Sequence, residues 1–210
     1  MASEIEICNI ALSHIGGFPI QSFEEDLKEA QECKRLYAQT RDEVLEAHDW
    51  DFARKHLALA LLADTYTGWT YAYGYPTDCL IARYIETGSG TAGATAYDVY
   101  SQDYVSVNKI RYEVIINAAL DQRVILTNQE SAELVYTARV EIPDLFSTLF
   151  RKVLAQKLAY YLANPVRGDA TIQKDMLQQY LLVINEARAS NANQSHVPPN
   201  DRGSILSSRD

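Results

Sequence analysis

Three aspartates and two histidines in the first half of the chain have types and spacings that could do chemistry. Asp49, Asp51 and Asp78 are carboxylates of the kind that glycoside hydrolases use in pairs, one as acid and the other as base or nucleophile. His48 and His56 lie near them, but a spacing of eight residues does not match the i, i+3 or i+4 spacing of two metal ligands on one helix. We therefore expect no metal site and no cofactor, and a glycan-degrading enzyme stays open as an alternative.

Two short motifs match known binding signatures, but their neighbours favour turns. Gly88–Gly93 has the G-x-G-x-x-G pattern, which binds a dinucleotide only where a helix begins, and the residues after it have the pattern of a strand. Arg167, Gly168 and Asp169 form an RGD triplet, in which Gly168 favours a turn and Asp169 favours a helix N-cap. We expect a hairpin loop at the first motif and the start of a helix at the second.

The signatures of a nucleophilic enzyme do not stand out in this sequence. We find no G-x-S-x-G motif and no Cys–His pairing that suggests covalent catalysis. The three cysteines, Cys8, Cys33 and Cys79, are far apart and form no C-x-x-C motif, so they support neither a zinc site nor a disulfide framework. Cys8 and Cys33 fall on apolar helical stripes, where a free cysteine behaves as a small hydrophobic residue. The sequence predicts a protein that is not an enzyme.

Aromatic side chains, including many of the 14 tyrosines, are concentrated in the middle of the chain. Trp69, Tyr71, Tyr73 and Tyr75 alternate with small or polar residues, and this period of two is typical of a strand. Tyrosine is common at interfaces because it combines a large apolar ring with a polar hydroxyl. We expect these residues to form a subunit or partner interface or an ordinary aromatic sheet core. A glycan- or protein-binding module built on this sheet is a further alternative.

Charge and hydropathy narrow the possible partners. The 210 residues carry a formal net charge of −9, and residues 1–51 hold most of it, with 12 acidic and 4 basic side chains. Tight DNA binding needs clustered Lys and Arg that displace counterions, and the chain lacks such clusters, so DNA would be repelled rather than held. No apolar run is long enough to cross a membrane, and the N-terminus lacks a signal-peptide pattern. We expect a protein made and used on the cytosolic side of a membrane.

Helical periodicity occurs at both ends of the chain. The apolar spacing predicts helices at residues 3–15, with Ser3 as the N-cap, and at about 26–48. It predicts a third helix that begins with Asp144 as its cap and ends at Asn164-Pro165, and a last helix capped by Asp169 that runs to about residue 190. Between the pairs, the period changes to that of short strands in an antiparallel meander. The pattern of Phe52–Leu62 is ambiguous and favours an extended segment. The predicted strands that follow it are 69–75, Leu80–Thr87, Tyr97–Tyr100, Tyr112–Asn117, Arg123–Thr127 and Ala132–Val140.

These elements predict an α+β fold. Each helix pair has an apolar stripe that needs covering, so we expect residues 1–51 and 142–190 to pack together as a four-helix bundle. Residues 52–141 are expected to form an inserted antiparallel β domain. Residues 191–210 are rich in Asn, Ser, Gln and Pro and cannot bury enough apolar surface to order alone, so we expect a flexible C-terminal tail.

Several short phrases of the sequence resemble those of a known family. The phrases are Ile7–Gly16 followed by Pro19-Ile20, the helix end with Asp49–Ala53, the start of the sheet at Tyr73–Leu80, and the strand Ala132–Val140 leading into Pro143 and a helix that ends at Ala159–Ala163. With these phrases and this layout, about residues 4–190 resemble the head–tail adaptor proteins of short-tailed phages, the tail tubular protein A family.

The resemblance implies a structural virion protein, with no catalytic residues to carry over. The family forms a homo-oligomeric ring, expected here to hold twelve subunits, that connects the portal protein to the tail nozzle protein and lines the channel through which DNA passes during ejection without specific binding. The chain would be synthesised in the host cytoplasm and act in the tail or neck of the virion, with no membrane partner. Its tail would dock on the portal, with Ile205 and Leu206 as apolar anchors and Arg202 and Arg209 as charged anchors.

Overall fold

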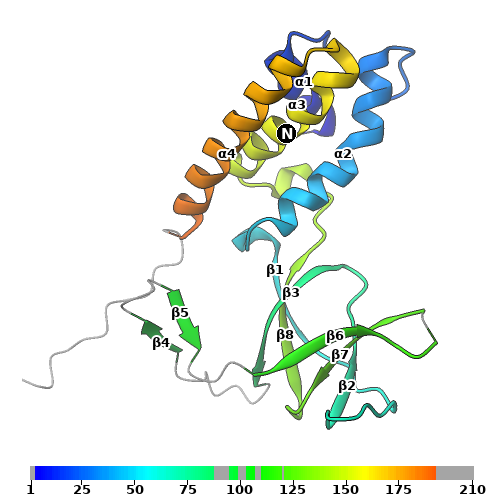
Figure 1. Ribbon diagram of the computed structural model, residues 1–210, viewed down its shortest axis with the longest axis vertical. Helices are drawn as coiled ribbons and strands as arrows, with labels where there is room; N and C mark the ends of the chain where they lie inside the picture. The colour runs from blue at the N-terminus through cyan, green and yellow to red at the C-terminus, as the bar shows by residue number, and fades with distance from the viewer. Residues whose placement is uncertain (1–2, 88–94, 99–102, 107–109, 120, 193–210) are drawn as a thin grey trace, which may run out of the picture.

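The computed structural model describes residues 3–87, 95–98, 103–106, 110–119 and 121–192. Within these ranges the chain has four α-helices, two three-stranded antiparallel sheets and a two-stranded hairpin, so the predicted α+β class is confirmed. The helices lie together at one end of the molecule and the two sheets lie at the other (Figure 1). None of the helices in the described ranges combines the length and the hydropathy needed to span a membrane.

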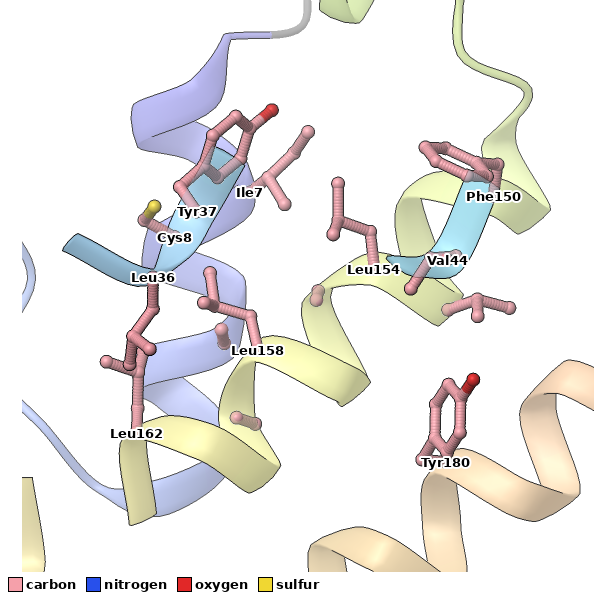
Figure 2. Packing of buried hydrophobic residues seen from close by; sticks show 14 of the residues in the cluster. Ile7, Cys8, Leu36, Tyr37, Val44, Phe150, Leu154, Leu158, Leu162 and Tyr180 are labelled. Atoms are coloured by element: carbon pink, nitrogen blue, oxygen red, sulfur yellow. The ribbon is translucent and has the colours of Figure 1, made fainter. Parts of the chain in front are cut away.

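The four helices pack around α3. The helices α1 (Glu4–Ile15), α2 (Lys28–Glu46) and α4 (Ala170–Ala192) each contact α3 (Thr148–Leu162), with α2 and α4 on opposite sides of it (Figure 1). All four contribute to one buried apolar core (Figure 2), which includes Ile7, Cys8, Leu36, Tyr37, Val44, Phe150, Leu154, Leu158, Leu162 and Tyr180. Burying one such large apolar side chain stabilises the fold by about 1.5–3 kcal/mol. The predicted burial of Cys8 and Cys33 is confirmed.

The ends of α1 follow from its sequence. The Ser3 hydroxyl accepts a hydrogen bond from the backbone N–H of Glu6 at 3.1 Å, which is the predicted N-cap. Gly16 ends the helix with φ +67°, a left-handed conformation that glycine adopts without strain. The helix buries Cys8, Leu12 and Ile15 on one face, as their helical spacing predicts.

Both predicted ends of the third helix are wrong. Asp144 lies in a short 3-10 turn, Pro143–Leu145, and the N-cap of α3 is Ser147, whose hydroxyl accepts a hydrogen bond from the N–H of Phe150 at 3.1 Å. At the other end the helix does not stop at Asn164-Pro165 but continues as a wider π-helical turn, Ala163–Arg167. Proline breaks a regular α-helix because it lacks an N–H and its ring meets the carbonyl one turn back, and the wider turn relieves that conflict.

The start of α4 is confirmed. Gly168 turns the chain with φ +65°, and the carboxylate of Asp169 accepts hydrogen bonds from the N–H groups of Thr171 and Ile172 at 2.7 and 3.3 Å. These bonds lower the pKa of Asp169, since they favour its charged form. The RGD triplet is therefore a turn followed by a helix cap.

The strands form two sheets that pack against each other. Sheet A has the order β1 (Arg54–Ala58), β8 (Ala132–Ala138) and β3 (Cys79–Thr87), and sheet B has the order β2 (Tyr71–Gly74), β7 (Arg123–Thr127) and β6 (Tyr112–Ile116). Between them lies a second apolar core, which contains Tyr73, Cys79, Ile85, Ile125, Leu134 and Tyr136. The hairpin of β4 (Thr95–Asp98) and β5 (Asp103–Ser106) pairs separately.

The pairing of the strands contradicts the predicted meander. Every pair is antiparallel, as expected, but β1 and β3 both pair with β8, and β2 pairs with β7. Within the two sheets only β6 and β7 are neighbours in both sequence and space. The strand β5 was also not predicted. A period of two indicates that a segment is a strand, but it carries no information about which distant strand will be its partner.

Candidate functional site at the joint between helices and sheets

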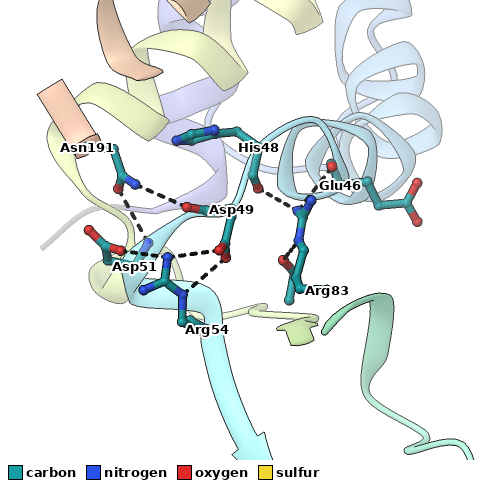
Figure 3. Close-up of polar contacts among 8 residues, drawn as sticks. Glu46, His48, Asp49, Asp51, Arg54, Arg83 and Asn191 are labelled. Carbon is teal, nitrogen blue, oxygen red and sulfur yellow. Dashed lines mark hydrogen bonds and ion pairs between the residues drawn. The ribbon is translucent and has the colours of Figure 1, made fainter. Parts of the chain in front are cut away.

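The segment that connects α2 to β1 is pinned to the helical core by Trp50. The indole N–H of Trp50 donates a hydrogen bond to the carbonyl of Val44 at 2.8 Å, and its ring packs edge-on against Phe150 with 5.1 Å between centroids. A short 3-10 turn, Asp51–Ala53, follows and leads directly into β1. We call the cluster around this segment the joint: residues 46–54 together with Arg83, Arg188 and Asn191. Figure 3 shows its polar contacts apart from that of Arg188.

Two of the aspartates singled out in the sequence bind one arginine. The guanidinium of Arg54 donates to both carboxylate oxygens of Asp49 at 2.8 and 3.3 Å, and it also lies 3.2 Å from the carboxylate of Asp51. Although partial burial opposes a charge on Arg54, the hydrogen bond and the negative charges raise its pKa. The two-pronged pairing fixes the guanidinium plane, so this triad orients the first residue of β1 relative to the end of the helices.

Arg83 joins sheet A to the end of α2. It occupies an irregularity in the pairing of β3 with β8, where the register shifts between Ala82 and Tyr84. Such a bulge re-aims a side chain. The guanidinium of Arg83 donates to the carbonyls of Glu46 and His48 at 3.2 and 2.8 Å, and to the Thr137 hydroxyl at 2.9 Å (Figure 3). Because the last carbonyls of a helix lack partners within it, a cation suits this position.

The last turns of α4 close the joint from the other side. Arg188 donates to the carbonyl of Ala47 at 2.9 Å. The side chain of Asn191 donates to the carbonyl of Asp49 at 3.1 Å and accepts from the N–H of Asp51 at 3.4 Å (Figure 3). A single amide thus satisfies two backbone groups of the connecting segment, and α4 is held where it ends.

His48 lies among the charged side chains of the joint. Its ring packs edge-on against Trp50 at 5.1 Å, and its buried Nε2 has no hydrogen-bond partner among the described residues. Burial lowers the pKa of His48, and the positive charges of Arg188 and Arg83 lower it further, against an opposing effect of Asp49. His48 is therefore neutral at pH 7.

The third predicted carboxylate, Asp78, is not part of the joint. It lies 2.6 Å from the ammonium of Lys55 and accepts a hydrogen bond from the hydroxyl of Tyr136 at 2.9 Å. Burial alone would raise the pKa of Asp78, but the bonds from Lys55 and Tyr136 outweigh it and hold the pKa below its usual value. All three aspartates thus pair with cationic side chains, Asp49 and Asp51 with Arg54 and Asp78 with Lys55, and these pairs favour a structural role for the three carboxylates.

The histidines are not brought together as metal ligands. His56 lies on β1 and its Nδ1 is 3.4 Å from a carboxylate oxygen of Glu86, whereas His48 faces the aromatic core of the helices. Among the residues that the structure describes, no three His, Cys, Asp or Glu side chains form a group that could hold a metal ion.

The four aromatic residues predicted as an interface or a sheet core have different surroundings. Tyr73 is almost fully buried between the sheets, and its hydroxyl donates to the carbonyl of Gln129 at 3.0 Å, so it belongs to the sheet core. Tyr71 and Tyr75 pack at the margin of that core. Trp69 precedes β2, which begins only at Tyr71, and packs on the outer face of sheet B. An interface role for Trp69, Tyr71 and Tyr75 stays a prediction.

Two predicted features lie outside the described residues. These are the glycine-rich motif Gly88–Gly93 and the docking residues Arg202, Ile205, Leu206 and Arg209. Conversely, the sequence patterns did not point to Arg54, Arg83, Arg188 and Asn191, which make the contacts of the joint. Only Arg54 carried a readable signal, because it follows Asp51 by three residues and Asp49 by five.

Comparison with known proteins adds no family to this description. The chain matches no protein-family model and no curated protein. Its function is therefore inferred from its own surfaces and contacts.

Proposed function

We propose that the chain is a structural virion protein, a ring-forming adaptor that connects a phage portal to the tail nozzle. The observation that supports this best is that the chain exposes apolar side chains on dissimilar surfaces. In the helical region, α4 exposes Leu181 and Leu182, and Phe18 is exposed after α1. In the sheet region, strands at two different edges expose further apolar residues. A closed ring of identical subunits needs two different surfaces on each subunit, because each contacts its neighbour head to tail.

In this ring the helices would form a four-helix bundle from residues 1–51 and 142–190, with residues 52–141 as an inserted β domain. The packing of α1, α2 and α4 around α3 supports the bundle, and so does the single core that they share. The joint supports a fixed orientation between bundle and sheets, since Arg83 and Asn191 bond to the connecting segment from opposite sides. Fixed orientation is what a ring subunit needs to present the same surfaces at every position.

The acidic N-terminal segment would line the DNA channel. Glu6, Glu24 and Asp26 of this segment are exposed. A surface with the same sign of charge as the phosphate backbone repels DNA and does not hold it. DNA would therefore pass through the ring without specific binding.

The predicted tail 191–210 begins two residues too early, because Asn191 and Ala192 belong to α4. The residues after Ala192 would carry the contact with the portal, through Arg202, Ile205, Leu206 and Arg209. The position of their attachment supports this role. The helix α4 ends at Ala192, and Asn191 fixes that end on the joint, so the chain leaves the helices at a defined point. The protein would be synthesised in the host cytoplasm and would act in the neck of the virion.

Native mass spectrometry of the pure chain, alone and mixed with a candidate portal ring, tests the proposal. We expect one chain bound per portal subunit, in a ring of twelve. A chain that forms no ring and binds no portal at micromolar concentration contradicts the proposal.

A truncation after Ala192 tests the docking residues separately. This variant keeps Asn191, and with it the closing contact of the joint, so the helices should stay folded by circular dichroism. We expect portal binding to be lost. Undiminished binding by the truncated chain would show that the contact lies elsewhere.

A further inference from the structure

Two of the three cysteines, which are far apart in sequence, lie together in the helical core. Cys8 lies on the buried face of α1 and Cys33 on the buried face of α2, and neither side chain is exposed. Their thiols are close enough to hydrogen-bond with each other. A disulfide requires two cysteines whose side chains point toward each other, and two thiols in contact between packed helices meet this requirement.

A neighbouring residue of α2 confirms that the faces of the two helices meet here. Tyr37 lies one turn after Cys33 on the same buried face of α2, and Figure 2 shows it next to Cys8. Burial raises the pKa of the Tyr37 hydroxyl, and the nearby Glu4 and Cys8 of α1 raise it further. Two successive turns of α2 thus face α1 at the level of Cys8.

The third cysteine lies in the other core. Cys79 is the first residue of β3 and packs between the two sheets, where it contacts the hydroxyl of Tyr75. The described residues therefore hold one pair of neighbouring thiols and one separate thiol. The separate thiol provides an internal control for the pair.

The folded chain protects the pair from oxidation. Contact with Cys33, together with burial, raises the pKa of the Cys8 thiol. The thiolate is the form that attacks an oxidant, so a buried and protonated thiol reacts slowly. Oxidation of the pair then requires a local opening of the helices that admits the oxidant.

We propose that Cys8 and Cys33 form an oxidation site, at which a peroxide converts the two thiols into a disulfide that ties α1 to α2. The thiolate of one cysteine attacks an oxygen of hydrogen peroxide, the O–O bond breaks, and a sulfenic acid forms while hydroxide leaves. The thiolate of the other cysteine attacks this sulfur, so the S–S bond forms, the S–O bond breaks and a second hydroxide leaves. Both hydroxides take up the thiol protons, and two thiols and one peroxide give one disulfide and two water molecules.

The disulfide would fix α1 on the helical core. The two cysteines are 25 positions apart, and a cross-link over such a loop stabilises a protein because it restricts the unfolded chain. A role in the virion rests on the proposed function, in which the chain folds in the reducing host cytoplasm and later leaves it. The pair would then be reduced during assembly and oxidised after release.

Peptide mapping of the full chain tests the site. Reduced protein is exposed to hydrogen peroxide, the peroxide is removed with catalase, and the chain is denatured, alkylated with iodoacetamide and digested. Trypsin cleaves after Lys28 and Lys34, so the two cysteines fall on separate peptides. We expect these peptides to be linked, the intact chain to be about 2 Da lighter before alkylation, and Cys79 to be alkylated. The Tm should rise by at least about 5 °C, and dithiothreitol should reverse the rise.

Two matched variants separate the pair from the third thiol. Cys79→Ala should give the same link and the same rise in Tm, whereas Cys33→Ala should give neither. Three results would overturn the proposal: sulfinic acid at Cys8 in place of the link, a disulfide that includes Cys79, or three thiols that are all still alkylated after prolonged oxidation. The peptide map of the unchanged chain decides among these results even if a variant folds poorly. The proposed function is tested separately, because portal binding by the reduced chain does not depend on the link.

Discussion

The helical region and the sheet region of this protein are stabilised in different ways. In the helical region one continuous apolar core receives side chains from all four helices. The sheet region divides its apolar residues between a core that lies between the sheets and a small cluster on the outer face of sheet B. Cations stack on aromatic rings in both regions: Arg111 lies 4.9 Å from the centroid of Trp69 in the sheets, and Lys157 lies 4.7 Å from that of Tyr180 in the helices.

This difference indicates that the two regions contribute differently to the stability of the chain. Burial of apolar surface is the main source of folding stability, so the helices should carry most of it. The sheets keep aliphatic residues exposed at both edges, and such residues stabilise a protein only once a neighbour covers them. The contacts of the joint attach the sheet region to the more stable helical region.

The largest expected effect comes from a cavity in the helical core. The ring of Phe150 packs against Trp50, Phe52 and Phe146 with centroid distances of 5.1, 5.0 and 4.8 Å. Phe150→Ala should lower the free energy of unfolding by about 3–5 kcal/mol, measured by guanidinium denaturation. Leu182→Ala, an exposed change in the same region, should stay within about 0.5 kcal/mol of the unchanged protein. A cost below about 1 kcal/mol for Phe150→Ala would mean that the helical core is not the main source of stability.

A smaller effect is expected where the two regions meet. Arg83→Ala removes the bonds to the carbonyls of Glu46 and His48 and to the Thr137 hydroxyl, so it should cost about 1.5–3 kcal/mol. Hydrogen exchange should rise in residues 47–58 and stay unchanged in the middle of α3. Arg83→Lys is the matched control, because it keeps the charge but loses the forked donors, and it should recover only part of the loss. If neither variant changes exchange at residues 47–58, then Arg83 does not hold the regions together.

The smallest effect concerns the pH dependence of the joint. The pKa of His48 is lowered in the folded chain, first by burial and then by Arg188, so the unfolded chain takes up the proton more readily below about pH 6.5. Stability present at neutral pH should therefore fall as the pH drops from about 6.5 towards the lowered pKa. His48→Gln should flatten the decline of Tm in this window, whereas His14→Gln, at the exposed end of α1, should not. An unchanged slope in His48→Gln would remove His48 as the cause.

Local features of the fold could be predicted from the sequence, but the pairing of distant segments could not. Ser3 and Asp169 cap their helices as predicted, because a cap depends only on neighbours within three residues. The prediction of Asp144 as the cap of the third helix is wrong, because the turn at Pro143–Leu145 precedes the helix and Ser147 caps it. The pairing of β1 with β8 joins residues about 80 positions apart in sequence, and no local pattern encodes it.

The same limit applies to the candidate site. The sequence pointed to Asp49 and Asp51 as carboxylates that could do chemistry, and the structure shows them holding Arg54. Arg83 could not be recognised in advance, because its role depends on an irregularity in strand pairing that no motif marks. Asn191 joins residues about 140 positions apart in sequence, and an isolated asparagine near a helix end gives no sign of that.

The chain has two tryptophans, and one lies in each region. Trp50 is buried in the aromatic core of the helices, and Trp69 is partly buried on the outer face of sheet B, where Arg111 stacks on its ring. Indole emission shifts to longer wavelength when water reaches the ring. Trp69→Phe would therefore leave a spectrum that reports on the helices alone, and its difference from the unchanged protein would report on the sheets. The protein thus carries its own pair of optical probes, which can show without any added label whether its two regions melt together or in succession.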